Sequence, residues 1–371
     1  MALTLRLYSS EDKEMRIVNS PAHDEAISGT GEDRRQPPPT PESIVMAATQ
    51  PSISRAIYTI VALGVPELVD AEPQSSAELA ERLSVRPHLL HKILRLAATT
   101  GVLRTGQDGR FSLTDDGRFL LAGHPTASRD LILTLQGPTV YAGLGASVEA
   151  LRTDVSAIEL TAGVPTFEYL RSHPDEAESF NRMMIAYHTG EPTAVAAAYD
   201  FSALGHIVDI GGGIGSLIRE VLTAAPLASG TLFDLPHVTA AARGALAGSP
   251  VFERLDFVPG DFFEGIPVVG ADAYMLSHII HDWDDATAAK VLERCRDAMG
   301  PDSRLLIIEG LIPDGDEQHP LKMLDVVIGL TIGGGERTLA EYESLLETAG
   351  LKLVGVTPTK SPVNVIEARQ R

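Results

Sequence analysis

The stretch from Ile207 to Ser216 constrains the fold more than any other part of this 371-residue chain. Ile207, Val208 and Ile210 are typical of a short buried strand. Four glycines within the next five residues would stop that strand, and a helical pattern begins at Ser216. Strand, glycine turn and helix form the start of a βαβ unit, and its turn can present bare backbone and free N–H groups to a ligand.

The glycine spacing indicates a ligand other than a dinucleotide. A dinucleotide fingerprint has a third glycine where this chain has a serine. The series here is Asp209-x-Gly211-x-Gly213-x-Gly215, and an acid at the strand end would repel pyrophosphate but suits a cationic or hydroxyl-rich ligand. An ordinary glycine-rich turn is the alternative. A second acid, Asp234, stands 23 positions after Gly211 and favours ligand binding.

Strand and helix patterns alternate after this stretch, which predicts an α/β fold with a mostly parallel sheet. Strands are expected near residues 206–210, 231–234, 255–258, 273–276 and 305–309, and helices near 214–225, 236–247, 284–299 and 338–349. Two final apolar runs, 351–358 and 363–368, suggest an antiparallel pair. Ligands bind beyond the carboxyl ends of the strands in such a sheet.

The part of the chain before residue 201 divides into three segments. Residues 1–40 mix polar and charged residues without a period, which predicts a disordered tail. Residues 41–122 show helical patterns followed by a short hairpin, the order of a winged helix. Residues 123–200 read as a helical linker that could line a substrate site, and residues 201–371 form the ligand-binding domain.

A winged helix raises the possibility of DNA binding. Residues 76–120 carry seven Arg or Lys against five Asp or Glu, a small excess, so a scaffold or dimerisation module is the favoured interpretation. The whole chain has a formal net charge of −20, which disfavours nucleic acid and anionic membranes as partners. No apolar run approaches the roughly 20 residues of a membrane span, and no signal peptide is recognisable. The single cysteine, Cys295, excludes an internal disulfide and is expected to pack in a helix, so a cytoplasmic location is expected.

Acids follow two of the other predicted strands. Asp234 could accept hydrogen bonds from ribose hydroxyls, or it could simply cap the next helix. Asp261 could accept the exocyclic amine of adenine, and Phe262 and Phe263 offer ring faces for stacking.

Two histidines, three acids and the only tryptophan gather in residues 278–285, after the fourth predicted strand. His278 and His281 with an acid could bind a metal. Alternatively one histidine is a general base, because its pKa lies near physiological pH. No further clustered histidine or cysteine completes a metal shell, so the base is favoured. Glu309 and Glu336 are further acids expected at this edge, although either could have an ordinary structural role.

These motifs occur together in one order: residues 209–215, Phe233-Asp234-Leu235-Pro236-His237-Val238, Gly260-Asp261-Phe262-Phe263, His281-Asp282-Trp283-Asp284-Asp285 and Gly334-Gly335-Glu336-Arg337-Thr338. Over residues 41–368 the chain resembles the caffeic-acid/hydroxyindole-type S-adenosylmethionine-dependent O-methyltransferases, in a form typical of bacterial natural-product pathways. The resemblance implies a Rossmann-like class I methyltransferase domain, preceded by a winged-helix domain that forms a homodimer.

The resemblance also assigns roles to residues. It implies S-adenosylmethionine as the cofactor, S-adenosylhomocysteine as its product, no metal, and His281 as the general base flanked by Glu309 and Glu336. The cofactor contacts fall on Asp209, Gly211, Gly213, Asp234, Leu235, Gly260, Asp261, Phe262, Ser277, Asp282 and Trp283. Contacts to an aromatic acceptor fall on Phe180, Met184, Asp325 and Thr331.

The chain departs from plant relatives at two positions. Plant relatives often have a lysine at the position of Ser277, which bears on a cofactor contact, and a polar pocket residue of theirs falls on Thr331, which bears on the substrate. We therefore expect an aromatic acceptor other than a plant monolignol precursor, in the biosynthesis of an antibiotic or other secondary metabolite. Two other functions stay open: hydroxylation or decarboxylation of a polyketide, which retention of His281 disfavours, and a winged-helix regulator that senses a ligand, which the acidic charge disfavours.

Overall fold

The computed structural model describes residues 40–126, 128–153 and 155–371, so nearly all of the tail predicted for residues 1–40 lies outside the described part. The described chain forms two compact units. We call the first, which extends to Pro138 and includes residues 174–187, the N-terminal unit. The C-terminal unit contains residues 139–173 and 188–371, so the segment 123–200 is shared between the two.

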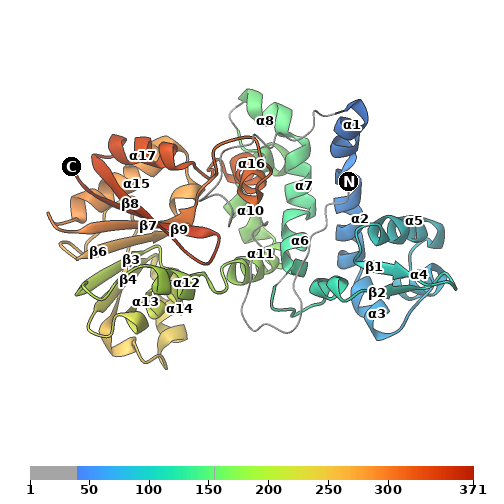
Figure 1. Cartoon of the computed structure of the whole chain (residues 1–371), viewed down its shortest axis with the longest axis horizontal. Coiled ribbons are helices and arrows are strands. Elements are labelled where there is room, and N and C mark those ends of the chain that lie inside the picture. Colours follow the sequence, from blue (N-terminus) through green and yellow to red (C-terminus); the bar gives the residue numbers. More distant parts are fainter. Residues whose placement is uncertain (1–39, 127, 154) are drawn as a thin grey trace, which may run out of the picture. The chain divides into compact units, whose positions relative to one another are not determined.

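The N-terminal unit is mainly helical and carries one small hairpin (Figure 1). Its elements are α1 (Pro41–Thr49), α2 (Pro51–Ala62), α3 (Val65–Ala71), α4 (Ser76–Leu83), α5 (Pro87–Ala98), β1 (Leu103–Thr105), β2 (Phe111–Leu113), the 3-10 helix η1 (Asp116–Leu120), α6 (Ser128–Leu135) and α11 (Pro174–Tyr187). The hairpin pairs Leu103 with Leu113, and Ser75 with Glu78 forms a capping box that begins α4. This order confirms the predicted helices and hairpin. The sequence pattern missed α1, which buries none of its residues and leaves Ile44 and Val45 exposed.

Among the described residues, no single helix is long and apolar enough to cross a bilayer. The bent pair of Pro41–Ala62 and Val65–Ala71, with an angle of 67° at its break, meets the requirement by length and composition only. Ile60, Val61 and Val65 of this pair are buried in the core of the N-terminal unit, which accounts for its apolar character.

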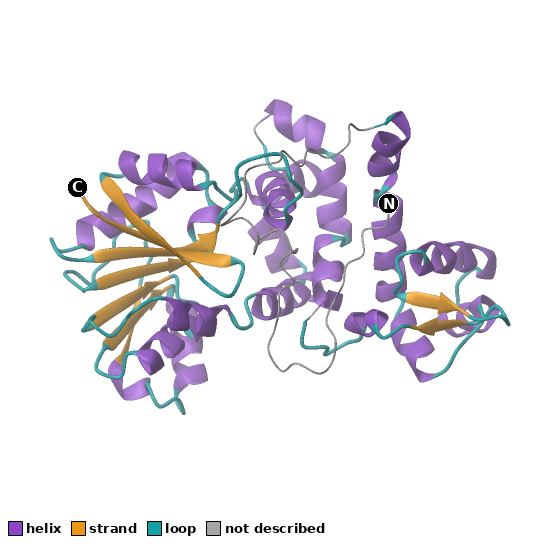
Figure 2. Ribbon diagram, in the orientation of Figure 1, coloured by secondary structure: helices purple, strands orange, loops and turns teal. Residues whose placement is uncertain are grey.

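The C-terminal unit is built on a seven-stranded sheet in the order β5-β4-β3-β6-β7-β9-β8 (Figure 2). The strands are β3 (His206–Ile210), β4 (Ser229–Asp234), β5 (Leu255–Pro259), β6 (Ala273–Ser277), β7 (Arg304–Gly310), β8 (Leu351–Pro358) and β9 (Val363–Gln370). The first five are parallel, and β9 runs antiparallel to β7 and to β8. The predicted mostly parallel sheet with a terminal antiparallel pair is confirmed.

Helices cover both faces of this sheet. The helices and 3-10 helices of the unit are α7 (Pro138–Gly145), α8 (Ser147–Thr153), α9 (Ala157–Ala162), α10 (Thr166–Ser172), α12 (Glu191–Ala198), α13 (Ser216–Ala224), α14 (Pro236–Leu246), η2 (Phe252–Arg254), η3 (Ile280–Asp282), α15 (Asp285–Ala298), α16 (Pro320–Ile332) and α17 (Leu339–Thr348). Val208 and Ile210 of β3 pack with α15 and α17, whereas Ile207 packs with α12, α13 and α14 on the other face. This alternation is the period of a strand buried on both sides.

Two details of the helices bear on the sequence reading. Cys295 is buried within α15, as expected for a packing residue, and burial raises the pKa of its thiol. The sequence reading missed α16. That helix is apolar on more than one face, because Met323 and Val326 are exposed while Leu321 is buried, so no single apolar stripe marks it.

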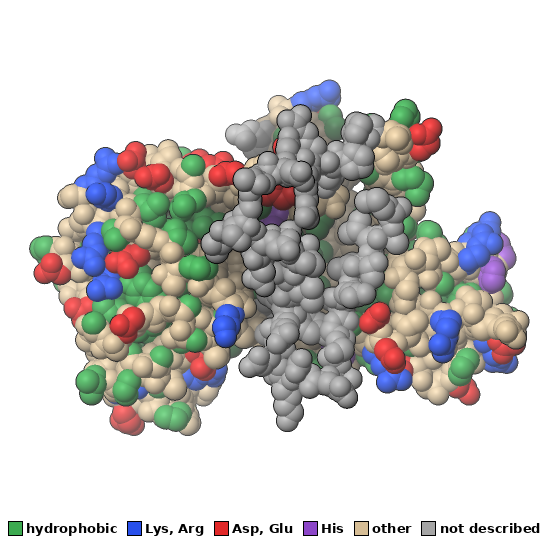
Figure 3. Space-filling model, viewed as in Figure 1, with side chains coloured by type: hydrophobic (Ala, Val, Ile, Leu, Met, Phe, Trp, Pro, Cys, Tyr) green, Lys and Arg blue, Asp and Glu red, His purple; other side chains and the backbone are tan. Residues whose placement is uncertain are grey.

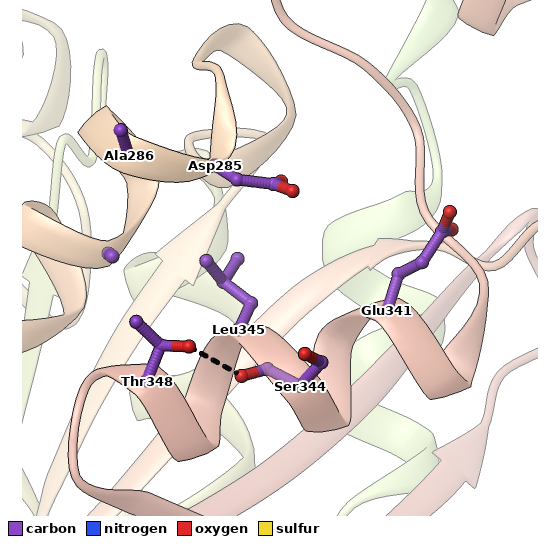
Figure 4. Close-up of a pocket in the computed structure, with 7 residues that line it drawn as sticks. Asp285, Ala286, Glu341, Ser344, Leu345 and Thr348 are labelled. Carbon is purple, nitrogen blue, oxygen red and sulfur yellow. Dashed lines mark hydrogen bonds between the residues drawn. The ribbon is translucent and has the colours of Figure 1, made fainter.

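Charged side chains of both signs are interspersed on the described surface in Figure 3. A depression of about 280 Å³ lies between α15 and α17 (Figure 4). It is lined by Asp285, Ala286, Ala289, Glu341, Ser344, Leu345 and Thr348. None of these residues is a histidine or belongs to the glycine turn, so this depression is separate from the predicted site residues.

Candidate active site

The glycine turn after β3 forms a backbone cradle. Gly211, Gly213 and Gly215 have φ of 67°, 56° and 80°, a region that glycine occupies without strain. A Cβ atom on Gly211 would lie 2.5 Å from Cδ1 of Ile279, so any other residue would have to displace that side chain as well as adopt a strained φ. A Cβ atom on Gly213 would meet nothing within 4 Å, so a ligand has room against the backbone at this residue.

Two acids lie at the cradle in different environments. Asp209 is buried beneath the turn, and its Oδ2 has no hydrogen-bond partner among the described residues. Burial, together with the charge of Asp234, raises the pKa of Asp209 to about 7. Asp234 ends β4, where its Oδ2 accepts from the N–H of Gly213 at 2.9 Å and its Oδ1 accepts from the N–H of Leu235 at 2.6 Å. Asp234 therefore fixes the turn and keeps lone pairs for a ligand.

The segment after β5 adjoins the same cradle. The N–H of Gly260 donates to the carbonyl of Asp234 at 2.9 Å, and a Cβ on Gly260 would lie 2.5 Å from the ring of Phe233. Phe262 lies 3.9 Å from the Cβ position of Gly211. Asp261 is exposed and accepts from the N–H two residues ahead. The structure thus brings the predicted cofactor residues of three strand ends to one edge of the sheet.

His281 follows β6 and is buried with a carboxylate beside each ring nitrogen. Its Nδ1 lies 3.0 Å from Oε1 of Glu336, and its Nε2 lies 3.6 Å from Oδ1 of Asp282. Asp325 of α16 positions Glu336, because its Oδ1 accepts from the N–H of Glu336 at 3.0 Å. The carbonyl of His281 accepts from the N–H of Gly335 at 2.8 Å. The loop that carries Glu336 is therefore held against the histidine from two sides.

Glu309, at the end of β7, acts on the backbone of this turn. Its Oε1 accepts from the three successive N–H groups of residues 279–281, at 3.1, 2.6 and 3.2 Å. Its Oε2 accepts from the hydroxyl of Tyr342 in α17. Glu309 is fully buried and none of its hydrogen bonds goes to the imidazole. Of the two acids predicted to flank the base, Glu336 contacts the ring and Glu309 holds the main chain.

The charges around His281 control its protonation. Burial is the largest single influence and favours the neutral ring, but the hydrogen bond to Glu336 and the charges of Glu309, Asp282 and Glu336 outweigh it and raise the pKa of His281 to about 9. Burial in turn raises the pKa of Asp282 to about 6. Below its raised pKa, the imidazole of His281 is therefore a cation surrounded by the carboxylates of Glu336, Glu309 and Asp282.

The pKa of His278, three residues earlier, is shifted in the opposite direction from that of His281. Its φ is 53°, unusual for a residue other than glycine. Its Nε2 lies 2.8 Å from Oε2 of Glu191, the first residue of α12, and the same oxygen lies 2.9 Å from Nδ1 of His188. Burial lowers the pKa of His278, whereas hydrogen bonds from both histidines outweigh the effect of burial and lower the pKa of Glu191 to about 2. The ring centroids of His278 and His281 are 5.2 Å apart.

The remaining predicted residues occupy varied positions. Trp283 packs edge-on against Phe263 with ring centroids 4.9 Å apart, and its carbonyl accepts from Arg337 at 2.8 Å. Ser277 is the last residue of β6. The hydroxyl of Thr331 donates to the carbonyl of Val327 within α16 at 2.6 Å.

Phe180 and Met184, the other predicted acceptor contacts, lie in α11 of the N-terminal unit. Their role therefore stays a prediction.

Sequence reasoning missed three side chains of this region: Tyr342, Glu191 and His188. Tyr342 lies 33 residues after Glu309, and Glu191 lies 87 residues before His278. No local motif links such distant positions. The only available signal was the presence of polar residues at the starts of helices, and many unrelated residues share it.

Comparison with known proteins agrees with this geometry. The sequence profile of the O-methyltransferase domain matches residues 141–352, and that of the O-methyltransferase dimerisation domain matches residues 48–123. The mitomycin biosynthesis 6-O-methyltransferase of Streptomyces lavendulae is 35% identical over 90% of this chain and 99% of its own. The 8-amino-8-demethylriboflavin N,N-dimethyltransferase of Streptomyces davaonensis is 34% identical over 85% of this chain and 92% of its own.

A solved structure is also similar. It is an O-methyltransferase from neocarzinostatin biosynthesis in complex with S-adenosylmethionine and 2-hydroxy-5-methyl naphthoic acid, and it is 31% identical with a TM-score of 0.76. The match covers 88% of this chain and 98% of that one. This chain therefore belongs to the O-methyltransferase family, and the family's dimerisation domain precedes its methyltransferase domain.

Proposed function

We propose that this enzyme transfers a methyl group from S-adenosylmethionine to a phenolic hydroxyl of an aromatic natural product, with His281 as the general base. One observation carries the proposal: His281, which is buried and paired with Glu336, lies on a turn whose Ile279 packs against Gly211 of the glycine cradle. A base and a ligand cradle so close together suit proton removal from an acceptor that lies beside the bound cofactor.

The residues around the cradle fit the cofactor. Asp234 presents a carboxylate to a hydroxyl-bearing group such as ribose, and Phe262 offers a ring face near Gly211. Gly213 leaves its backbone open to a ligand. When bound, the cofactor supplies an electrophilic methyl group on a sulfonium. The acidic surroundings of the histidine turn suit that positive charge.

The chemistry of the base follows from its hydrogen bond. Because Nδ1 of His281 donates to Glu336, the proton acceptor is Nε2. A phenol has a pKa near 10, so most of it is protonated at neutral pH. His281 takes that proton as the oxygen–methyl bond forms and the sulfur–methyl bond breaks. The ring must be neutral to act, and a neighbouring sulfonium favours the neutral ring by lowering the pKa of His281 from its value of about 9.

The acceptor class rests on the relatives. One is named for a step of mitomycin biosynthesis, and the structure of another contains a hydroxynaphthoic acid. We therefore propose that the acceptor is an aromatic precursor of an antibiotic.

An aromatic amine is the second candidate acceptor. The riboflavin relative is named as an N,N-dimethyltransferase and is about as similar to this chain as the O-methyltransferases are. Paired phenol and aniline analogues with isotope-labelled S-adenosylmethionine would distinguish the two. Label on oxygen supports the first candidate, and label on nitrogen alone supports the second.

We also propose that the enzyme is a homodimer through its N-terminal unit. The match of residues 48–123 to the dimerisation profile supports this assembly. Light scattering should give twice the chain mass of 39.6 kDa. A mass of one chain at micromolar concentration would contradict the dimer.

The base is tested by His281→Ala. Turnover of a phenolic acceptor should fall by about 10²–10⁴-fold, while the calorimetric Kd for S-adenosylmethionine changes only a few-fold. His206→Gln is the matched control, because His206 lies at the other end of β3 and contacts Thr231. Turnover of His281→Ala within a few-fold of wild type would refute the assignment.

A further inference from the structure

We propose that His188, Glu191 and His278 form a binding site for one divalent transition-metal ion, with Zn²⁺ as the best-suited ion. Metal binding at this site does not depend on methyl transfer, so this proposal is independent of the function proposed above. It links the start of α12 to the turn after β6.

The three side chains already converge on one point. One ring nitrogen of His188, one oxygen of Glu191 and one ring nitrogen of His278 all lie within 4.8 Å of one another. Nδ1 of His188 and Nε2 of His278 lie 2.9 and 2.8 Å, respectively, from the same carboxylate oxygen, Oε2 of Glu191. In a tetrahedral zinc site with bonds of 2.0–2.1 Å, ligand atoms are about 3.3 Å apart. The nitrogens and the oxygen would therefore have to separate by roughly half an ångström.

The donor set determines the class of ion. Two imidazole nitrogens and one carboxylate oxygen form a set that binds zinc with a fourth position left open. Mg²⁺ and Ca²⁺ prefer oxygen ligands, so a site with two nitrogens disfavours them. Each imidazole would bind as a neutral ring with its proton on the nitrogen that does not face the metal.

A second observation points to a ligand at this cluster. Oε1 of Glu191 is buried and has no hydrogen-bond partner among the described residues. Buried polar atoms without a partner are costly, at about 1–3 kcal/mol each. The left-handed backbone of His278 adds a cost of roughly 1–2 kcal/mol. A metal ion would engage the carboxylate and compensate for the backbone strain that directs this ring toward Glu191.

The local charge also favours a cation. Glu191 is one of four buried or half-buried carboxylates in this region, together with Asp282, Glu309 and Glu336. His281 balances one of these charges and is hydrogen-bonded to Glu336. The proposed metal ligands therefore differ from the pair that the sequence suggested, His278 and His281. The partners of His278 come from residues 188–191, on the side of α12.

The site is tested on the full-length, tag-free protein after treatment with a chelator. Titration with Zn²⁺, followed by calorimetry, should show one equivalent with a Kd in the micromolar range or tighter. Co²⁺ should give the visible absorption of a site with nitrogen ligands. Glu191→Gln and His278→Gln should each weaken binding by at least about tenfold, the lower limit measured for loss of an outer-shell partner. His206→Gln, a histidine outside the cluster, should bind like wild type.

Two further measurements keep the test decisive if a variant folds poorly. Zn²⁺ should raise the Tm of the wild type and of His206→Gln more than that of Glu191→Gln. X-ray absorption of the zinc-loaded wild type should show two imidazole ligands. Absence of a stoichiometric site in the wild type, absence of imidazole ligation, or wild-type affinity in both Glu191→Gln and His278→Gln would overturn the proposal.

Discussion

The glycine cradle after β3 and the histidine turn after β6 lie side by side at one edge of the sheet, yet they are built in different ways. The cradle is shaped by its backbone: three glycines have positive φ, and Asp234 fixes Gly213 through its amide. The histidine turn is shaped by side chains from distant elements, because Glu309 holds its backbone and Glu336 holds its ring.

This difference separates shape from charge. Added volume should damage the cradle, because its backbone depends on three glycines with positive φ. The histidine turn should instead respond to changes of charge, because a conservative substitution of a nearby acid alters the proton affinity of His281 without changing the volume of the side chain. Variants of each region should therefore affect different measurable quantities.

The largest effect is expected for Glu336→Gln. This variant keeps the shape of the side chain but removes the charge that orients and stabilises the imidazolium of His281. Turnover should fall by about 10²–10⁴-fold with an unchanged Kd for S-adenosylmethionine. Glu347→Gln, which removes a carboxylate on the surface, is the control and should keep wild-type turnover. Loss of cofactor affinity in parallel with turnover would break the separation of the two regions.

The pH dependence of stability is the next largest effect. The folded pKa of His281 is about 9 against an ordinary value of 6.5, so the folded state binds the proton more tightly than the unfolded state. The resulting stabilisation, on the order of 3 kcal/mol, is fully present below pH 6.5 and is lost as the pH rises through 9. Denaturant unfolding of the wild type and of His281→Gln between pH 6 and 10 checks this. Parallel curves for the two proteins would contradict it.

A smaller effect is expected for Gly211→Ala. The positive φ and the contact with Ile279 should cost about 2 kcal/mol. In the free protein the cradle should relax to avoid this cost, so the cost is met when the cofactor binds and corresponds to roughly thirtyfold weaker cofactor binding. The pKa of His281 should stay near 9. Gly244→Ala is the control, because a Cβ at this position of α14 meets nothing within 4 Å. Cofactor binding equal to that of wild type would show that the cradle tolerates volume.

The smallest effect is expected for Tyr342→Phe. Loss of a hydrogen bond to the buried charge of Glu309 should lower the free energy of unfolding by about 1.5 kcal/mol. The turn should loosen, so kcat should fall more than KM changes. Tyr274→Phe removes another buried hydroxyl of the same unit and should lower stability without changing kcat. Equal kcat changes in both variants would show that Tyr342 contributes packing alone.

The sequence predicted the regions that depend on neighbouring residues. The glycine cradle, the five parallel strands and the position of His281 after a strand all follow from patterns that span a few residues. It did not reveal which acid contacts the imidazole, because Glu309 ends an apolar strand and Glu336 follows a glycine run, and neither pattern specifies a tertiary contact. Tyr342 and Glu191 were missed for the same reason, since their partners lie 33 and 87 residues away. Helix α16 was missed because its apolar residues face more than one direction.

The most direct test of the account is the protonation of His281 itself. Nuclear magnetic resonance of histidine-labelled protein, with His281→Gln to assign the signal, gives the pKa without an acceptor. The account predicts a pKa of about 9 in the wild type and a clear fall toward 6.5, the ordinary value, in Glu336→Gln. A wild-type pKa near 6.5, or the same raised pKa in both proteins, would contradict the claim that Glu336 holds the base.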